Sequence, residues 1–163
     1  AITAIIGKSN VMDSAQNSFI SSTFWTERIG PTAALKTLEI MEREKSWEII
    51  TKTGISIRNR WQKLADKYEI SISHWGLPAM TGFTIESKNS LQYKPLITQE
   101  MLSKGYLAAN SVYVCTAHNN EIIDGYFEAL EGVFKLIGEC ENGRKISTLL
   151  KVEVCHSGFK RLT

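Results

Sequence analysis

Hydroxyl side chains gather in one short segment, residues 19–31, which reads FISSTFWTERIGP. Ser21, Ser22 and Thr23 can donate hydrogen bonds, and a turn just before a helix adds unpaired amide N–H groups and the positive end of the helix dipole. This combination suits an anion, and phosphate is the obvious candidate. The same hydroxyls could instead only cap the helix that Pro31 begins. Local chemistry leaves both interpretations open.

Cysteine and histidine offer little further chemistry. Cys115, Cys140 and Cys155 are odd in number and widely spaced, which favours reduced thiols in a cytosol over a disulfide framework. No Cys-x-x-Cys or His-x-x-x-His spacing occurs, so we expect no structural metal. The sequence has no apolar run of about 18 residues and no basic N-terminal region typical of a signal peptide. We therefore expect a soluble, cytoplasmic protein without a membrane partner.

The charges argue against nucleic acid as a partner. The chain has 19 basic and 17 acidic residues, a formal net charge of +2, and the two signs are interspersed. A nucleic-acid module would need a basic face, and the sequence pattern shows none. The hydrophobic content of 43% is enough for a folded core.

Four main helices are predicted from apolar residues spaced three and four apart. One begins near Pro31 and runs to about residue 44, and a long amphipathic helix covers 47–68, where Gly54 marks a close crossing or a kink. A third covers 91–103 and ends before Gly105. The fourth begins after Asn119, a good N-cap residue. Its predicted buried face consists of Ile122, Tyr126, Leu130, Val133 and Ile137.

Period-two alternation predicts strands at 70–75 and 80–85, joined by a turn at 76–78. We expect Trp75 and Phe83 to pack in the core rather than to stack on nucleic-acid bases, because neither strand holds Lys or Arg. Short strands are expected at 106–109 and 112–116, and a buried strand at 2–6. A single short strand must pair with something, so we expect the chain to be a piece of a longer polypeptide.

Two segments carry a resemblance to a known family. The run SSTFWTE at 21–27, followed by GPxAALxTLE at 30–39, resembles the class III aminotransferases that depend on pyridoxal 5'-phosphate (PLP), close to the glutamate-1-semialdehyde aminomutase subgroup. The runs QEML at 99–102, GYL at 105–107 and TAH at 116–118 are similar to the family's ending, where a helix and a glycine lead into a strand that lines the substrate cavity. The hairpin at 70–85 resembles one in the family's small domain.

The resemblance implies the C-terminal portion of a PLP-transferase fold, of class α/β (α+β). Residues 1–45 would be the end of the large cofactor-binding domain, and residues 46–163 a small domain whose antiparallel sheet is covered by helices. Thr23, with Ser22 beside it, matches the residue that binds the cofactor phosphate of the neighbouring subunit. The implied enzyme is a homodimer with shared active sites that transfers an amino group between an amino compound and a carbonyl compound.

The implied catalytic lysine lies upstream of the residues that match Ala1, so we expect the isolated chain to be inactive. Lys8 is interpreted as part of a solvated turn. The aminomutase has a glutamate in a loop between its last two strands, where this chain has the shorter run Ala109-Asn110-Ser111. The semialdehyde substrate therefore does not follow from the resemblance. Asn110 either faces the substrate as a neutral hydrogen-bonding group or holds a turn. The alternative function is a non-catalytic α+β module that binds a ligand or a protein.

Overall fold

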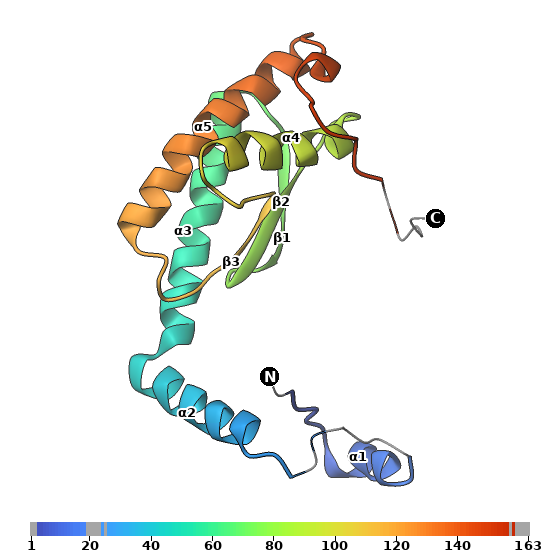
Figure 1. The fold of residues 1–163 in the computed structure, drawn as a ribbon, viewed down its shortest axis with the longest axis vertical. Coiled ribbons are helices and arrows are strands. Elements are labelled where there is room, and N and C mark those ends of the chain that lie inside the picture. Colours follow the sequence, from blue (N-terminus) through green and yellow to red (C-terminus); the bar gives the residue numbers. More distant parts are fainter. Residues whose placement is uncertain (1–2, 19–23, 25, 157, 159–163) are drawn as a thin grey trace. The chain divides into compact units, whose positions relative to one another are not determined.

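The computed structural model describes residues 3–18, 24, 26–156 and 158 (Figure 1). The chain divides into two compact units, residues 1–46 and residues 47–163, called the N-terminal unit and the C-terminal unit below.

The N-terminal unit contains two helices, α1 (Ser9–Gln16) and α2 (Ile29–Glu44). The predicted helix from Pro31 to about residue 44 is confirmed, and it begins two residues earlier. Pro31 is tolerated because it lies in the first turn, where an amide N–H has no partner within the helix. Lys45 ends α2 in the left-handed conformation, with a φ of 48°.

The predicted buried strand at 2–6 is wrong for the residues that the structure describes. Residues 3–8 have no regular secondary structure, and the side chains of Ile5 and Ile6 are 80% and 92% exposed. A strand is stable only when its backbone N–H and C=O groups have partners. Among the described residues of this unit there is no second strand to supply them. An apolar run alone therefore does not make a strand here.

The C-terminal unit is an α+β structure with one three-stranded antiparallel sheet. Its elements in chain order are α3 (Ser46–Lys67), β1 (Ile72–Leu77), β2 (Met80–Ile85), α4 (Ser90–Ser103), β3 (Ser111–Tyr113), α5 (Asn120–Glu141) and a 3-10 turn, Ile146–Thr148. The strand order is β1-β2-β3, and both pairs are antiparallel. The predicted α+β class, with helices over an antiparallel sheet, is confirmed.

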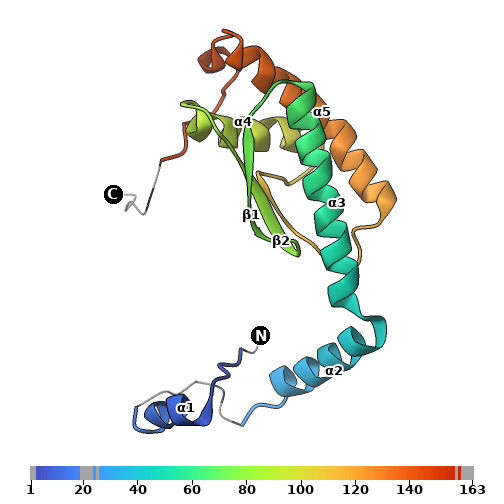
Figure 2. The same cartoon turned by 180° about the vertical axis from the view of Figure 1, so that it is seen from behind.

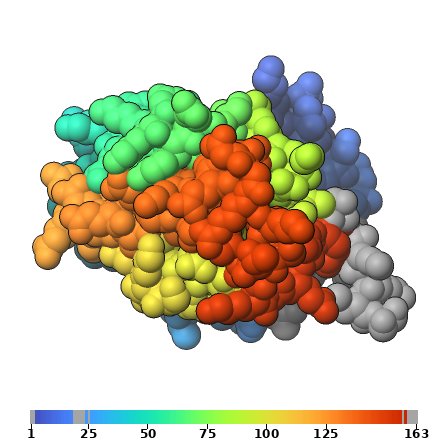
Figure 3. All heavy atoms as spheres, turned by 90° about the horizontal axis from the view of Figure 1, so that it is seen from above, coloured from blue at the N-terminus to red at the C-terminus, as the bar shows by residue number. Residues whose placement is uncertain are grey.

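Helices cover one face of this sheet. Phe83 of β2 is fully buried, and its ring lies 4.9 Å from the Trp61 ring of α3 and 5.6 Å from the Phe134 ring of α5. The helix α4 contacts both α5 and β2, and it runs across the direction of α5 (Figures 1 and 2). From above, the side chains of α5 fill the space between the end of α3 and the end of α4 (Figure 3). The core thus joins three helices and the sheet.

Trp75 does not pack in the core as predicted. Its side chain is 43% exposed on the opposite face of the sheet from Phe83, because neighbouring strand residues point to opposite faces. It lies across from Gly82 of β2, and a Cβ atom added at Gly82 would come within 2.2 Å of the Trp75 ring. The indole therefore covers the space that a side chain at position 82 would fill.

The strand expected at 106–109 is also wrong, and the strand expected at 112–116 is reduced to β3. The amide of Ala108 donates to the carbonyl of Tyr106 at 3.0 Å, which makes a tight local turn and removes this amide from sheet pairing. Pairing with β2 begins only at Ser111, which lies opposite Gly82. The segment 106–109 is therefore an irregular connection that leads from α4 to β3.

The predicted cap of α5 is confirmed. The side-chain oxygen of Asn119 accepts a hydrogen bond from the amide of Ile122 at 2.9 Å. Three residues of the predicted buried face, Leu130, Val133 and Ile137, are fully buried. Ile122 is 47% exposed, and its neighbour Ile123 is buried in its place because the first turn of the helix lies beside an open pocket.

Candidate functional site

A carboxylate caps the start of helix α2. The two oxygens of Glu27 accept hydrogen bonds from the amides of Ile29 and Gly30, each at 2.7 Å. Ser21, Ser22 and Thr23 lie outside the described residues, and the helix begins six residues after Thr23. The alternative that these hydroxyls cap a helix therefore stays a prediction.

The same carboxylate changes how phosphate could bind. The positive end of the α2 dipole and its first two amides are already used by Glu27, so an anion would meet a negative charge there. A phosphate bound by this segment must therefore be held by the hydroxyls and amides of residues 21–23 themselves. The prediction that Ser22 and Thr23 bind phosphate remains a prediction.

The structure describes two other residues that the sequence analysis considered, Lys8 and Asn110. Lys8 is exposed as predicted, but it is the N-cap residue of α1 and not part of a turn, because Ser9 and Asn10 are already helical. The side-chain amide of Asn110 donates to the main-chain carbonyl of Phe83 at 2.8 Å, and the main-chain carbonyl of Asn110 accepts from the amide of Phe83 at 3.0 Å. Asn110 thus extends the pairing of β2 beyond β3 with one main-chain and one side-chain hydrogen bond.

One open pocket of the C-terminal unit has a volume of about 310 Å3. It lies between α3, the segment that connects α4 to β3, and the first turns of α5. The lining side chains are mostly apolar, and none of these described residues is Lys, Arg, Asp or Glu. They are Ile57, Tyr106, Leu107, Ala108, Ser111, Val112, Tyr113, His118, Ile122, Ile123 and Tyr126. Asn110 is not among them.

Two contacts between α3 and α5 hold the wall of this pocket. The indole Nε1–H of Trp61 donates to the hydroxyl oxygen of Tyr126 at 3.0 Å, across a sequence separation of 65 residues. The guanidinium of Arg60 lies 4.2 Å above the ring of Phe127 and forms an ion pair of 2.5 Å with Asp124. Burial raises the pKa of the Tyr126 phenol well above its ordinary value, so the hydroxyl keeps its proton at neutral pH.

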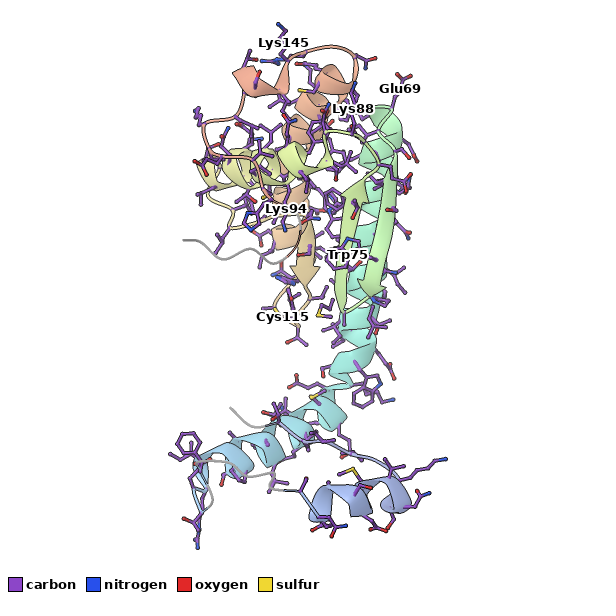
Figure 4. The ribbon with its side chains drawn as sticks, turned by 90° about the vertical axis from the view of Figure 1, so that its right-hand side faces the viewer. Glu69, Trp75, Lys88, Lys94, Cys115 and Lys145 are labelled. Atoms are coloured by element: carbon purple, nitrogen blue, oxygen red, sulfur yellow. The ribbon has the colours of Figure 1, made fainter. Side chains whose placement is uncertain are left out.

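His118 is the main polar group that sequence reasoning missed. It lines the pocket, and its Nδ1 atom accepts a hydrogen bond from the amide of Cys115 at 3.2 Å. Figure 4 shows Cys115 in the loop that follows β3. The only signal in the sequence was its place in the TAH run before the capped helix.

The pocket by itself does not fit PLP. The cofactor needs an imine-forming lysine, a carboxylate opposite its pyridine nitrogen and donors for its phosphate. The described lining residues include neither a lysine nor a carboxylate. This cavity suits part of a substrate, and the cofactor would have to be anchored by residues elsewhere.

The described residues form neither a metal-ligand cluster nor a membrane-spanning helix. Within residues 3–18, 24, 26–156 and 158, no group of three or more His, Cys, Asp and Glu side chains is placed to hold a metal ion. No helix in this described part of the chain is both long and apolar enough to cross a bilayer. Cys115 is exposed, Cys155 is half-buried and Cys140 is buried, and all three are free thiols.

Comparison with known proteins identifies one sequence relative and one protein of similar fold. The 3-aminobutyryl-CoA aminotransferase of Cloacimonas acidaminovorans (strain Evry) is 28% identical over 139 residues, which make up 80% of this chain and 33% of that enzyme. A structure of the PLP internal aldimine form of the FumI protein of Sphingopyxis sp. MTA144 has a TM-score of 0.72 and 16% identity. The match covers 89% of this chain and 36% of that one. No protein-family model matches the chain.

The chain therefore spans about a third of the length of each of these proteins. Its fold is one that also occurs in a PLP-containing protein, as the resemblance of its sequence implied. The similarity to a named aminotransferase supports the wider group of PLP-dependent aminotransferases. The glutamate-1-semialdehyde aminomutase subgroup is not confirmed.

Proposed function

We propose that this chain is part of a PLP-dependent aminotransferase, which moves an amino group between an amino compound and a carbonyl compound. The observation that carries this proposal is the 28% identity to an aminotransferase over 80% of the chain. The fold shared with a PLP-containing protein supports it. We prefer an aminotransferase to an aminomutase because the relative is an aminotransferase and because the run Ala109-Asn110-Ser111 lacks the aminomutase glutamate.

The proposed cofactor is PLP, which supplies an electron sink for the carbon that loses or gains the amino group. In this proposal Ser22 and Thr23 donate hydrogen bonds to its phosphate. Glu27, four residues after Thr23, caps the start of α2. The cap anchors the chain at the C-terminal end of the proposed phosphate-binding segment. The imine-forming lysine and the carboxylate that faces the pyridine nitrogen belong to residues outside this chain.

We further propose that the active enzyme is a cytoplasmic homodimer. In the resembling family the residue that matches Thr23 reaches the cofactor of the neighbouring subunit, so each site would need both copies. The isolated chain would then lack transaminase activity, because the family's imine-forming lysine lies upstream of it and the described pocket lining holds no lysine. The pocket between α3 and α5 would form part of the wall of the substrate cavity.

The experiment that tests this function compares two threonine variants of the longer polypeptide that contains this chain. Thr23→Ala removes one hydrogen bond to a charged phosphate, which contributes about 1.5–3 kcal/mol, so the Kd for PLP should rise about tenfold or more. The matched control is Thr26→Ala, an exposed threonine three residues further on. Fluorescence titration with PLP measures both. An unchanged Kd in the Thr23 variant would remove Thr23 from the site.

A further inference from the structure

The pocket between α3 and α5 has the chemistry of a site for an uncharged ligand. Its described lining is dominated by aliphatic and aromatic side chains and holds no Lys, Arg, Asp or Glu. A charged group that entered it would lose water without gaining a counter-ion, which is costly. Its volume of about 310 Å3 lies at the small end of the range for small-molecule sites.

The fold fixes the proton of His118 on one nitrogen. Because Nδ1 accepts a hydrogen bond from the amide of Cys115, Nδ1 carries no proton in the neutral ring. The proton must then be on Nε2, which has no hydrogen-bond partner among the described residues. The main chain therefore holds the imidazole as a hydrogen-bond donor at the edge of an apolar pocket.

The hydroxyl of Tyr126, another lining residue, is a second donor. The oxygen of the Tyr126 hydroxyl already accepts a hydrogen bond from Trp61, so the hydroxyl proton is available to donate to a ligand. The ring of Tyr106 packs edge-on against the Tyr126 ring, with 6.3 Å between centroids, and limits its movement. His118 and Tyr126, whose acceptor atoms are already used within the chain, thus offer protons to a ligand. The other hydroxyls of the lining, on Tyr106, Ser111 and Tyr113, can donate or accept, so the pocket as a whole suits a ligand with acceptor oxygens.

We propose that this pocket binds an uncharged, mainly aliphatic arm of the substrate, and that His118 selects this arm by donating from Nε2 to a carbonyl oxygen such as that of an amide or an ester. The assignment of the ligand as a substrate rests on the proposed aminotransferase function. The binding of the arm itself does not, because the pocket is built from residues of this chain alone.

The test uses three six-carbon probes of nearly equal size, added to the isotope-labelled 163-residue chain at pH 7.5. Hexanamide carries a neutral acceptor, whereas hexanoate and hexylammonium carry opposite charges. Amide and indole NMR signals report the binding, and the indole N–H signal of Trp61 is assigned by its loss in Trp61→Phe. Hexanamide should shift the signals of Val112, His118 and Trp61 and bind in the millimolar range. Both charged probes should bind at least about fivefold more weakly.

Three histidine variants complete the test. His118→Phe keeps an aromatic ring but removes the donor, so it should weaken hexanamide about five- to tenfold. His118→Gln keeps an N–H donor and should recover part of the affinity. His156→Phe, a change at an exposed histidine outside the pocket, should have no effect. A dispersed amide spectrum shows that each variant is folded.

The proposal is overturned if hexanamide does not shift the pocket signals, if a charged probe binds as tightly, or if His118→Phe leaves the affinity unchanged. These results are independent of the cofactor because the assay contains none. A longer polypeptide that fails to bind PLP would contradict the proposed function and leave a positive hexanamide result intact.

Discussion

A single glycine in α3 provides the sharpest test of the packing that builds the pocket. Gly54 is buried in the middle of a 22-residue helix, where an alanine would normally be favoured by about 1 kcal/mol. A Cβ atom at this position, however, would lie 1.8 Å from the carbonyl oxygen of Pro78 and 2.5 Å from its carbonyl carbon. Pro78 begins the turn between β1 and β2, so α3 and the hairpin cross at this point.

The clash should outweigh the gain in helix propensity. The shortest ordinary contact is 3.4 Å, so α3 and the hairpin would have to separate by about 1.6 Å. The obstructing atoms belong to the backbone of a two-residue turn and cannot swing away as a flexible side chain would. Overpacking of this kind costs about 1–3 kcal/mol and sometimes more. A separation of about 1.6 Å against backbone atoms places this clash in the upper part of that range, about 2–3 kcal/mol. After the propensity gain of about 1 kcal/mol is subtracted, we expect Gly54→Ala to destabilise the chain by about 1–2 kcal/mol.

Urea unfolding followed by tryptophan fluorescence and circular dichroism measures this change. The matched control is Gly132→Ala in α5, an exposed helical glycine whose nearest described neighbour is the flexible Nζ end of Lys104 at 3.1 Å. Gly132→Ala should be neutral or stabilising by up to about 1 kcal/mol. If Gly54→Ala were as stable as the parent chain, the close crossing between α3 and Pro78 would be refuted.

Two further predictions concern a cap and a buried histidine. Glu27→Ala removes both hydrogen bonds to the start of α2, which should cost about 0.5–2 kcal/mol of helix stability. The amides of Ile29 and Gly30 should then exchange faster with deuterium. Unchanged exchange rates would argue against the cap. Burial and the guanidinium of Arg58 lower the pKa of His74, so the unfolded chain takes up the proton first. Its free energy of unfolding should fall as the pH drops through the ordinary histidine pKa of about 6.5 towards the lowered value. His74→Phe should reduce this slope, and an identical pH dependence in the variant would contradict it.

Local signals in the sequence predicted the elements whose stabilising contacts are themselves local. Asn119 needs only the amide of Ile122 three residues away to cap α5, and Gly105 takes its positive φ of 85° just after α4. Long apolar periodicity likewise placed α2 and α3. These contacts involve neighbours in the chain, so residue type and spacing are enough to reveal them.

The failures have a common physical cause in long-range contacts. The alternation around Trp75 correctly indicated a strand, but period two defines two faces and does not say which one the helices cover. The pocket combines Ile57, His118 and Tyr126 from three separate segments, and the tautomer of His118 depends on the backbone of Cys115.

The most direct measurement of the central claim is borohydride reduction in the presence of PLP, followed by peptide mass spectrometry. The longer polypeptide that contains this chain should show the absorbance of a lysine imine and, after reduction, carry one PLP adduct on a lysine outside residues 1–163. The isolated chain should acquire no specific adduct. A stoichiometric adduct on Lys8 or another lysine of this chain would contradict the account, as would a longer polypeptide that forms no imine at all.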